Sequence, residues 1–133
     1  MLRGTPHHIE LYVTDLARST AFWSFLLESL GYVLSQQWAE GRSYQLGATY
    51  VVLVQTETAY LEPPYHRKRV GLNHLAFHGG SRAEVEALTA ALRARGVTIL
   101  YEDRHPFAAG PDYYAVFCED PDRIKVEVVA EGE

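Results

Sequence analysis

The sequence predicts an α+β fold made of two copies of one βαβββ unit. The first observation is a pair of similar strand-like stretches that begin at His8 and His74, 66 residues apart. The second is the amphipathic helix pattern that follows each stretch. The third is a glycine after each helix pattern, Gly31 and Gly96, 65 residues apart. Because the two offsets agree to within one residue, a duplicated unit explains the pattern better than chance.

Each copy is expected to contain a strand, a helix and three further strands. In the first copy these are a strand over 7–13, a helix over 16–29, and strands over 31–37, 42–47 and 50–55. In the second they are a strand over 73–78, a helix over 82–94, and strands over 97–101, 112–118 and 123–129. We expect one domain over residues 1–133, with modules at about 7–56 and about 72–130 and a linker at about 57–71.

Local signals support both helices and the linker. Asp15 can cap the first helix, and Ser81-Arg82-Ala83-Glu84 has the pattern of a capping box at the start of the second. The apolar stripe of the first helix contains Phe22, Leu26, Leu27 and Leu30, with Trp23 at its margin. Pro63-Pro64 marks the linker as a non-strand segment.

Composition excludes several classes of function. The chain is 47% hydrophobic with a net charge of −5, which favours a packed core and argues against nucleic-acid binding. Cys118 is the one cysteine, so no internal disulfide can form, and it is expected to be a strand residue rather than a nucleophile. No apolar run reaches the roughly 18 residues of a membrane span, and no signal peptide precedes the first strand. We expect a cytoplasmic protein with no membrane partner.

Strand alternation places three possible metal ligands on comparable faces. His8 shares a face with Glu10 and Tyr12, opposite an apolar face, and His7 is expected to point the other way. His74 shares a face with His78, and Glu127 lies on the mixed face of its own strand. In each strand the apolar face is expected to pack under a helix, which leaves the three candidate ligands on the opposite, concave side.

Two imidazoles and a carboxylate suit a divalent metal such as Zn, Ni, Mn or Fe(II). Three protein ligands leave coordination positions open for water and substrate, as catalytic sites require. The alternatives are structural: a strand histidine is often only a hydrogen-bonded residue, and Glu127 could pair with Lys125 or Arg123 at the surface. The matched positions of His8 and His74 in the repeat favour the metal site.

Three segments carry a resemblance to a known family. They are His8-Ile9-Glu10-Leu11-Tyr12-Val13-Thr14-Asp15-Leu16-Ala17-Arg18-Ser19, Leu72-Asn73-His74-Leu75-Ala76-Phe77, and Phe117-Cys118-Glu119-Asp120-Pro121-Asp122-Arg123-Ile124-Lys125-Val126-Glu127-Val128. Over about residues 7–130 the chain resembles the vicinal oxygen chelate superfamily, which includes glyoxalase I, fosfomycin-resistance thiol transferases, extradiol dioxygenases and bleomycin-resistance proteins. The resemblance implies two βαβββ modules that form a cupped mixed β-sheet with helices on its outer face. It also implies His8, His74 and Glu127 as metal ligands, and a homodimer.

The chain departs from the family pattern at two positions. Arg123 occupies a turn position where the family usually has glycine, which is tolerable if its backbone stays outside the left-handed region. The fourth metal position that glyoxalase I fills corresponds to Leu53 if Tyr50 is aligned with Ile124, or to Gln55 after a slip of two residues. We favour Leu53, which implies a three-ligand site.

The leading hypothesis for function is a metal-dependent enzyme acting on a small oxygenated substrate that chelates the metal, with chemistry of the lyase or isomerase type. The alternatives are a metal-free ligand- or drug-binding protein of the bleomycin-resistance type, or a dioxygenase-like member. Glu10 is a possible general base, although a rim carboxylate paired with an arginine is an equal alternative. The candidate substrate-binding residues are Tyr12, Trp38, Arg42, Tyr44, Arg104 and Tyr113.

Overall fold

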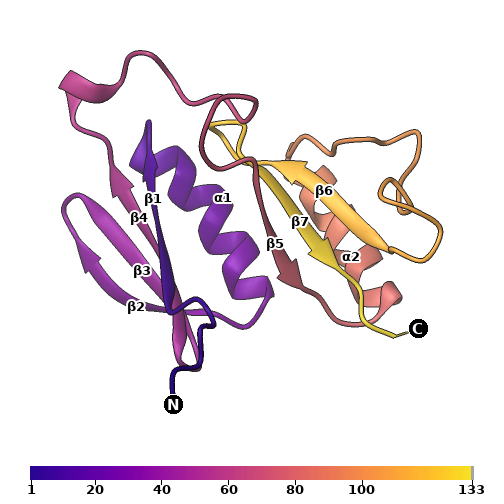
Figure 1. Ribbon diagram of the computed structural model, residues 1–133. Helices are drawn as coiled ribbons and strands as arrows, with labels where there is room; N and C mark the ends of the chain where they lie inside the picture. Colours follow the sequence, from indigo (N-terminus) through magenta and orange to yellow (C-terminus); the bar gives the residue numbers. More distant parts are fainter. Residues whose placement is uncertain (133) are drawn as a thin grey trace. The chain divides into compact units, whose positions relative to one another are not determined.

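The computed structural model describes residues 1–132, which form two compact units, one from Met1 to Pro64 and one from Tyr65 to residue 132 (Figure 1). The N-terminal unit contains β1 (His8–Val13), α1 (Leu16–Ser29), β2 (Val33–Trp38), β3 (Gly41–Leu46), β4 (Thr49–Gln55) and a short 3-10 helix, η1 (Thr58–Tyr60). The C-terminal unit contains β5 (His74–His78), α2 (Arg82–Ala94), β6 (Ala115–Glu119) and β7 (Lys125–Val129). No helix among residues 1–132 has the length and apolar character needed to cross a membrane.

The two sheets have the same topology, apart from one strand. In the N-terminal unit the strand order is β1-β4-β3-β2, and in the C-terminal unit it is β5-β7-β6. In both, the first strand pairs in parallel with the last, and the remaining pairs are antiparallel. The predicted α+β fold of two related modules with mixed sheets is therefore confirmed.

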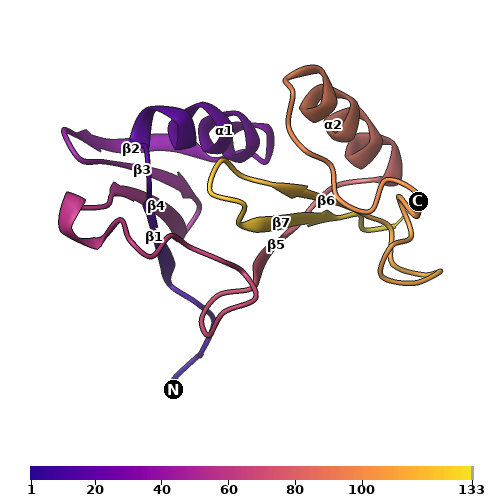
Figure 2. The same cartoon turned by 90° about the horizontal axis from the view of Figure 1, so that it is seen from above.

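Helix α1 packs on one face of the four-stranded sheet, as Figure 2 shows. Its side chains Trp23, Leu26 and Leu27 are fully buried, so Trp23 lies at the centre of the contact rather than at its margin. The Asp15 side chain accepts a hydrogen bond from the Arg18 backbone N–H at 3.2 Å, which caps the helix as predicted. Gly31 ends the helix with a φ of +97°, a conformation that glycine adopts at little cost.

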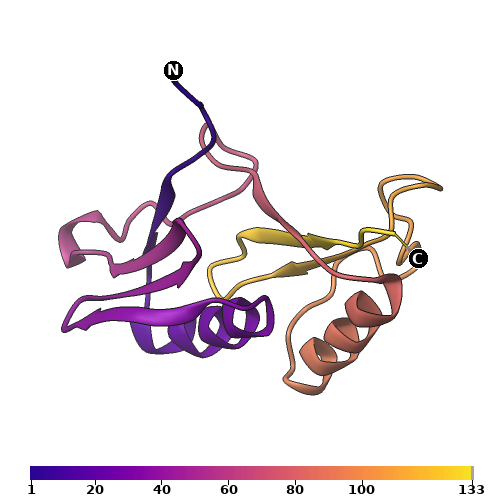
Figure 3. The same ribbon diagram turned by 90° about the horizontal axis from the view of Figure 1, so that it is seen from below.

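Helix α2 lies on one face of the three-stranded sheet, as can be followed in Figure 3. Val85 and Leu92 of this helix are buried together with the sheet residues Val116, Val126 and Val128. Cys118 is buried in the same sheet, and burial raises the pKa of its thiol to about 12. The thiolate needed for nucleophilic attack is therefore scarce near neutral pH, in keeping with the predicted structural role.

The capping box at the start of α2 is present and gives a first testable prediction. The Ser81 hydroxyl accepts from the Glu84 backbone N–H at 3.1 Å, and the Glu84 carboxylate accepts from the Ser81 backbone N–H at 3.0 Å. Ser81→Ala is expected to lower the free energy of unfolding by about 1 kcal/mol, measured by urea unfolding at pH 7. An unchanged free energy of unfolding would contradict a stabilising role for the cap.

The Glu84 half of the box should depend on pH. The backbone hydrogen bond from Ser81 is the main cause that lowers the pKa of Glu84 below its usual value of 4.5. Its contribution to stability is therefore complete above pH 4.5 and is lost as the pH falls through the lower folded-state pKa. In Glu84→Gln this part of the acid dependence should disappear, whereas Glu57→Gln, which changes an exposed loop carboxylate, should keep it.

The predicted strand over 97–101 is wrong. Only Ile99 forms a bridge, to Cys118 of β6, supported by backbone hydrogen bonds from Leu100 N to Phe117 O and from Glu119 N to Thr98 O. The extended run then stops because Tyr101 has a φ of +57°, which turns the chain away from the sheet. The loop that follows runs to residue 114, so β6 also begins three residues later than the predicted strand 112–118.

Arg123, in the turn between β6 and β7, does not keep its backbone outside the left-handed region as expected. This residue has a φ of +67°, in the left-handed region that non-glycine residues rarely adopt. Contacts on both sides hold this backbone in place. Asp120 Oδ1 accepts hydrogen bonds from the backbone N–H groups of Asp122 and Ile124, at 2.9 and 2.8 Å. Arg67 donates to the Arg123 carbonyl and pairs with Glu119, at 3.0 and 2.8 Å. The neighbouring contacts therefore replace the conformational freedom of the usual glycine.

Candidate functional site

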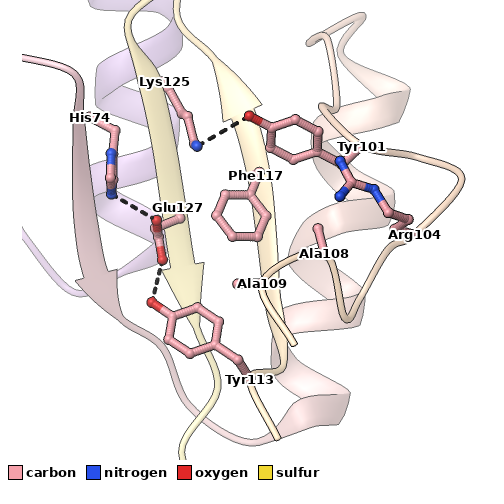
Figure 4. Close-up of a pocket in the computed structure, with 9 residues that line it drawn as sticks. All are labelled: His74, Tyr101, Arg104, Ala108, Ala109, Tyr113, Phe117, Lys125 and Glu127. Carbon is pink, nitrogen blue, oxygen red and sulfur yellow. Dashed lines mark hydrogen bonds and ion pairs between the residues drawn. The ribbon is translucent and has the colours of Figure 1, made fainter. Parts of the chain in front are cut away.

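The C-terminal unit contains a cavity of about 430 Å³ on the open face of its sheet, opposite α2 (Figure 4). Strand residues form one part of the lining and the loop 101–114 forms the other. The lining residues are His74, Tyr101, Arg104, Ala108, Ala109, Tyr113, Phe117, Lys125 and Glu127. Of the six predicted pocket residues, Arg104 and Tyr113 are thus placed beside His74 and Glu127.

Strand register explains why distant residues meet here. His74 of β5 pairs with Lys125 of β7, and Glu127 of β7 pairs with Phe117 of β6. Lys125 and Glu127 are two residues apart, so their side chains project from the same face of the sheet. The intervening Val126 is fully buried on the helix side. The face expected from sequence for His74 and Glu127 is therefore the face that lines the cavity.

His74 and Glu127 are brought into direct contact. His74 Nε2 lies 3.1 Å from Glu127 Oε2, and the carboxylate is almost completely buried. Asn73 Nδ2 donates to the Arg67 carbonyl at 3.0 Å, which leaves Asn73 Oδ1 as the acceptor 2.7 Å from His74 Nδ1. The hydrogen on a neutral His74 ring is therefore on Nδ1, and the lone pair of Nε2 points toward the carboxylate.

Tyr113 holds the other oxygen of the same carboxylate. Its hydroxyl donates a hydrogen bond to Glu127 Oε1, as the dashed line in Figure 4 indicates. This hydrogen bond is the main cause that raises the pKa of Tyr113 to about 12, with burial and the Glu127 charge adding to it. The phenol is therefore neutral near pH 7, and the carboxylate is fixed from both sides.

The donor atoms of this pair fit a divalent metal. An unprotonated Nε2 and a carboxylate oxygen both carry lone pairs, so they need a proton or a cation between them to lie so close. The Asn73–His74 hydrogen bond is also the kind of outer contact that orients histidine ligands of metals. Within residues 65–132, as within 1–64, no group of three or more His, Cys, Asp or Glu side chains gathers around one point.

His8, the third predicted ligand, belongs to β1 of the N-terminal unit. Its exposed ring stacks on Tyr50, with ring centroids 4.5 Å apart and planes 9° apart. The expectation that His7 points away from it is wrong, because the Nδ1 atoms of His7 and His8 are 2.9 Å apart. Strand alternation does not apply to His7, which precedes the first residue of β1.

The other predicted residues of the N-terminal unit differ in their surroundings. Glu10 and Tyr12 are exposed on the same face of β1 as His8. Arg42 donates to the carbonyls of Trp38 and Gly41, at 2.8 and 2.7 Å, so its guanidinium supports the β2–β3 turn. Tyr44 is buried. Burial raises the pKa of its phenol, and the charge of Glu28 in α1 raises it further. Tyr44 is therefore a core residue near the helix rather than one that faces substrate.

The residue at the fourth metal position also differs from the one that the sequence alignment gave. Register pairs His8 with Tyr50 and Glu10 with Val52, whereas His74 pairs with Lys125 and Ala76 with Glu127. The residue equivalent to Glu127 is therefore Val52, one position before the expected Leu53. Leu53 is fully buried.

Gln55 has a structural role in the N-terminal unit. Its side-chain oxygen accepts from the Leu16 backbone N–H at 2.8 Å, and its nitrogen donates to the Thr14 carbonyl at 2.7 Å. It thereby ties the end of β4 to the start of α1, and both ends of its amide are already engaged.

Several site residues are not evident from the sequence. In the sequence, Lys125 is only a possible partner for Glu127. Its spacing of two residues from Glu127 nevertheless places it on the cavity face. Asn73 precedes the predicted ligand directly, but nothing in its type indicates that it would orient the ring. Tyr101 is presented by its left-handed backbone, of which the sequence pattern gives no sign.

The loop 101–114 is anchored to α2 rather than loose. His105 Nε2 lies 2.5 Å from Glu86 Oε1, and the His105 side chain is buried. The Arg82 guanidinium lies over the rings of Phe107 and Tyr114, at 5.8 and 5.0 Å from their centroids. These contacts fix the segment that carries Arg104 and Tyr113 into the cavity.

Comparisons with known proteins agree with this fold. The chain is 57% identical to the protein YqjT of Bacillus subtilis over 93% of its own length and 97% of that protein. It is 30% identical to the glutathione transferase FosA of Serratia marcescens, covering 92% of the chain and 77% of FosA. A crystal structure of a proposed glyoxalase from Bacillus halodurans matches with a TM-score of 0.95 and 59% identity, covering 97% of each chain.

One fold relative was crystallised with a metal. A mutant of the fosfomycin resistance protein FosX of Listeria monocytogenes, in complex with Mn(II) and 1S,2S-dihydroxypropylphosphonic acid, matches with a TM-score of 0.69 and 21% identity, covering 98% of this chain and 93% of FosX. At this identity the likeness concerns the fold alone. The sequence model of one family matches residues 5–128. The chain belongs to the Glyoxalase/Bleomycin resistance protein/Dioxygenase superfamily.

Proposed function

We propose that this protein is a divalent-metal-dependent enzyme whose small substrate binds the metal through adjacent oxygens. The observation that carries the proposal is the 3.1 Å approach of His74 Nε2 and Glu127 Oε2 at the wall of a cavity. His8 is proposed as the third ligand because it begins β1 as His74 begins β5, and both strands pair in parallel with the last strand of their sheet. Zn, Ni, Mn or Fe(II) would suit this ligand set.

The chain's own residues would prepare the ligands and the substrate. Asn73 keeps the Nε2 lone pair of His74 directed at the site, and Tyr113 keeps the Glu127 carboxylate from rotating. A bound metal would act as a Lewis acid that stabilises negative charge on a substrate oxygen. Glu10, exposed on the face of β1 that carries His8, is the proposed general base. Chemistry of the lyase or isomerase type, in which a proton moves beside a polarised carbonyl, fits these roles.

We also propose a cellular location, an oligomeric state and two substrate contacts. We place the protein in the cytoplasm, where the buried thiol of Cys118 would stay reduced without a partner. By resemblance to its family we propose that it works as a homodimer. Among the pocket candidates, Arg104 and Tyr113 are proposed to contact substrate because they line the cavity.

Metal binding is the direct test. We expect the parent protein, loaded after chelator treatment, to hold about one divalent metal per chain by elemental analysis. His74→Ala and His8→Ala should both lose it, because each would remove one of only three ligands. His78→Ala is the matched control, since His78 lies further along β5 and its side chain is largely exposed beside Glu131.

The variants separate two ways in which the proposal could fail. Full metal content in His74→Ala would refute the site, whereas full content in His8→Ala alone would leave the His74–Glu127 pair and require a different third ligand. Absence of metal from the parent under every loading condition would instead favour a metal-free binding protein.

A further inference from the structure

Two positive side chains of the cavity form no ion pair with any of residues 1–132. Arg104 and Lys125 both line it, and in the described part of the chain neither forms an ion pair. Among the described lining residues Glu127 is the only carboxylate, and both of its oxygens are engaged by His74 and Tyr113. The cavity therefore offers two cationic groups that form no ion pair with a described residue.

The two cations are gathered around a single tyrosine, as Figure 4 shows. The Arg104 guanidinium carbon and Lys125 Nζ each lie 5.0 Å from the centroid of the Tyr101 ring. Lys125 Nζ donates to the Tyr101 hydroxyl at 3.2 Å, so the phenol oxygen is an acceptor and its own hydrogen stays available. Arg104, Lys125 and Tyr101 thus present an excess of hydrogen-bond donors, which is what an oxyanion requires.

The Tyr101 backbone, the Phe117 ring and the contacts of the loop 101–114 hold this cluster in place. Tyr101 adopts a φ of +57°, an unfavourable conformation for a residue with a side chain, and its ring packs edge-on against Phe117 at 5.5 Å. Strain of this kind persists where the surroundings enforce it and is often found at functional sites. The His105–Glu86 contact fixes the same loop one residue beyond Arg104. The donors are therefore arranged before any ligand arrives, which lowers the entropic cost of binding.

We propose that Arg104, Lys125 and Tyr101 form an anion-binding subsite that receives a carboxylate, phosphate or phosphonate group of the substrate. The inference rests on the proposed function, since it assigns this group to the substrate of the same cavity. Lys125 is the strand partner of His74, so the anionic group would bind next to the proposed metal ligands. The substrate class is then a small molecule with an anionic oxygen group near its metal-chelating oxygens.

The cation–π contacts could instead serve only to pack the loop, and the two roles predict different results. We would titrate chelator-treated, metal-free protein with inorganic phosphate and, separately, with acetate, following amide chemical shifts by NMR. The parent should bind at least one of the anions saturably. Lys125→Gln and Arg104→Gln should each weaken that binding about tenfold or more, because each loses a charge-assisted hydrogen bond. Lys68→Gln, which removes an exposed loop charge, is the control and should bind as the parent does.

The two anions distinguish the sources of the charge. Tighter binding of phosphate points to a phosphate- or phosphonate-bearing substrate, and tighter binding of acetate to a carboxylate. No saturable binding by the parent, or equal binding by all variants, would overturn the subsite. His74→Ala should retain anion binding while it loses metal, so failure of the metal proposal and failure of the subsite give separate signatures. Urea unfolding of each variant would confirm that the compared proteins are folded.

Discussion

Glu127→Gln is expected to reduce divalent-metal affinity by more than about 100-fold, because loss of even an outer contact to a ligand costs about 10- to 100-fold. The substitution keeps the shape of the side chain, and the amide oxygen can still accept from Tyr113. The amide nitrogen can donate to the lone pair of His74 Nε2, which lies 3.1 Å away from the present oxygen. The fold should therefore persist while the charged ligand is lost.

Isothermal titration of the chelator-treated protein would measure this change, with urea unfolding as the check on folding. Glu131→Gln is the matched control, because Glu131 is a more exposed carboxylate beside His78 and lies outside the His74–Glu127 cavity. Its metal affinity should equal that of the parent. If Glu127→Gln bound metal as tightly as the parent, the buried carboxylate would be structural and the metal proposal would fail.

Trp23→Ala is expected to cost about 3–5 kcal/mol of the free energy of unfolding. Trp23 is the largest fully buried side chain, and its ring meets Phe22 edge-on at 5.2 Å within the interface between α1 and its sheet. Removal leaves a cavity that the rigid helix cannot collapse to fill. Because small domains have only about 5–15 kcal/mol in total, the N-terminal unit should become marginally stable.

Urea unfolding followed by far-UV circular dichroism would measure the loss without relying on the removed fluorophore. Trp38→Ala provides the comparison within the same unit, since Trp38 is 39% exposed at the end of β2. It should cost roughly half as much or less, because less apolar surface returns to water. Equal costs for the two substitutions would show that burial in α1 is not what stabilises the unit.

The elements with local signals were predictable from the sequence. Both helices have the bounds expected, because Asp15 and Ser81 are caps that act on a backbone N–H three residues away. Every predicted strand except that over 97–101 was also found, with ends displaced by at most three residues. The faces of His74 and Glu127 followed from the same alternation, so the part of the site that strands supply could be inferred.

What could not be predicted depends on contacts between distant segments. The run after Gly96 has the composition of a strand, yet it leaves the sheet at Tyr101 because the loop is bound to α2 through His105 and Glu86. The position of Arg104 over the Tyr101 ring could not be predicted either, because it depends on the same loop. The residue equivalent to Glu127 was misplaced by one position because only the hydrogen-bond register, and no motif, identifies Val52.

The equivalence of Val52 and Glu127 has a consequence for the history of the molecule. If one ancestral gene was copied and joined, both copies began with the same residue at this point of the last strand. One copy now holds an apolar side chain buried in its core, and the other holds a carboxylate. The repeats have therefore diverged: the N-terminal half repeated twice would lack the carboxylate of the ligand set that we propose, and the C-terminal half repeated twice would carry it twice. The proposed set of three ligands thus depends on the difference between the two copies.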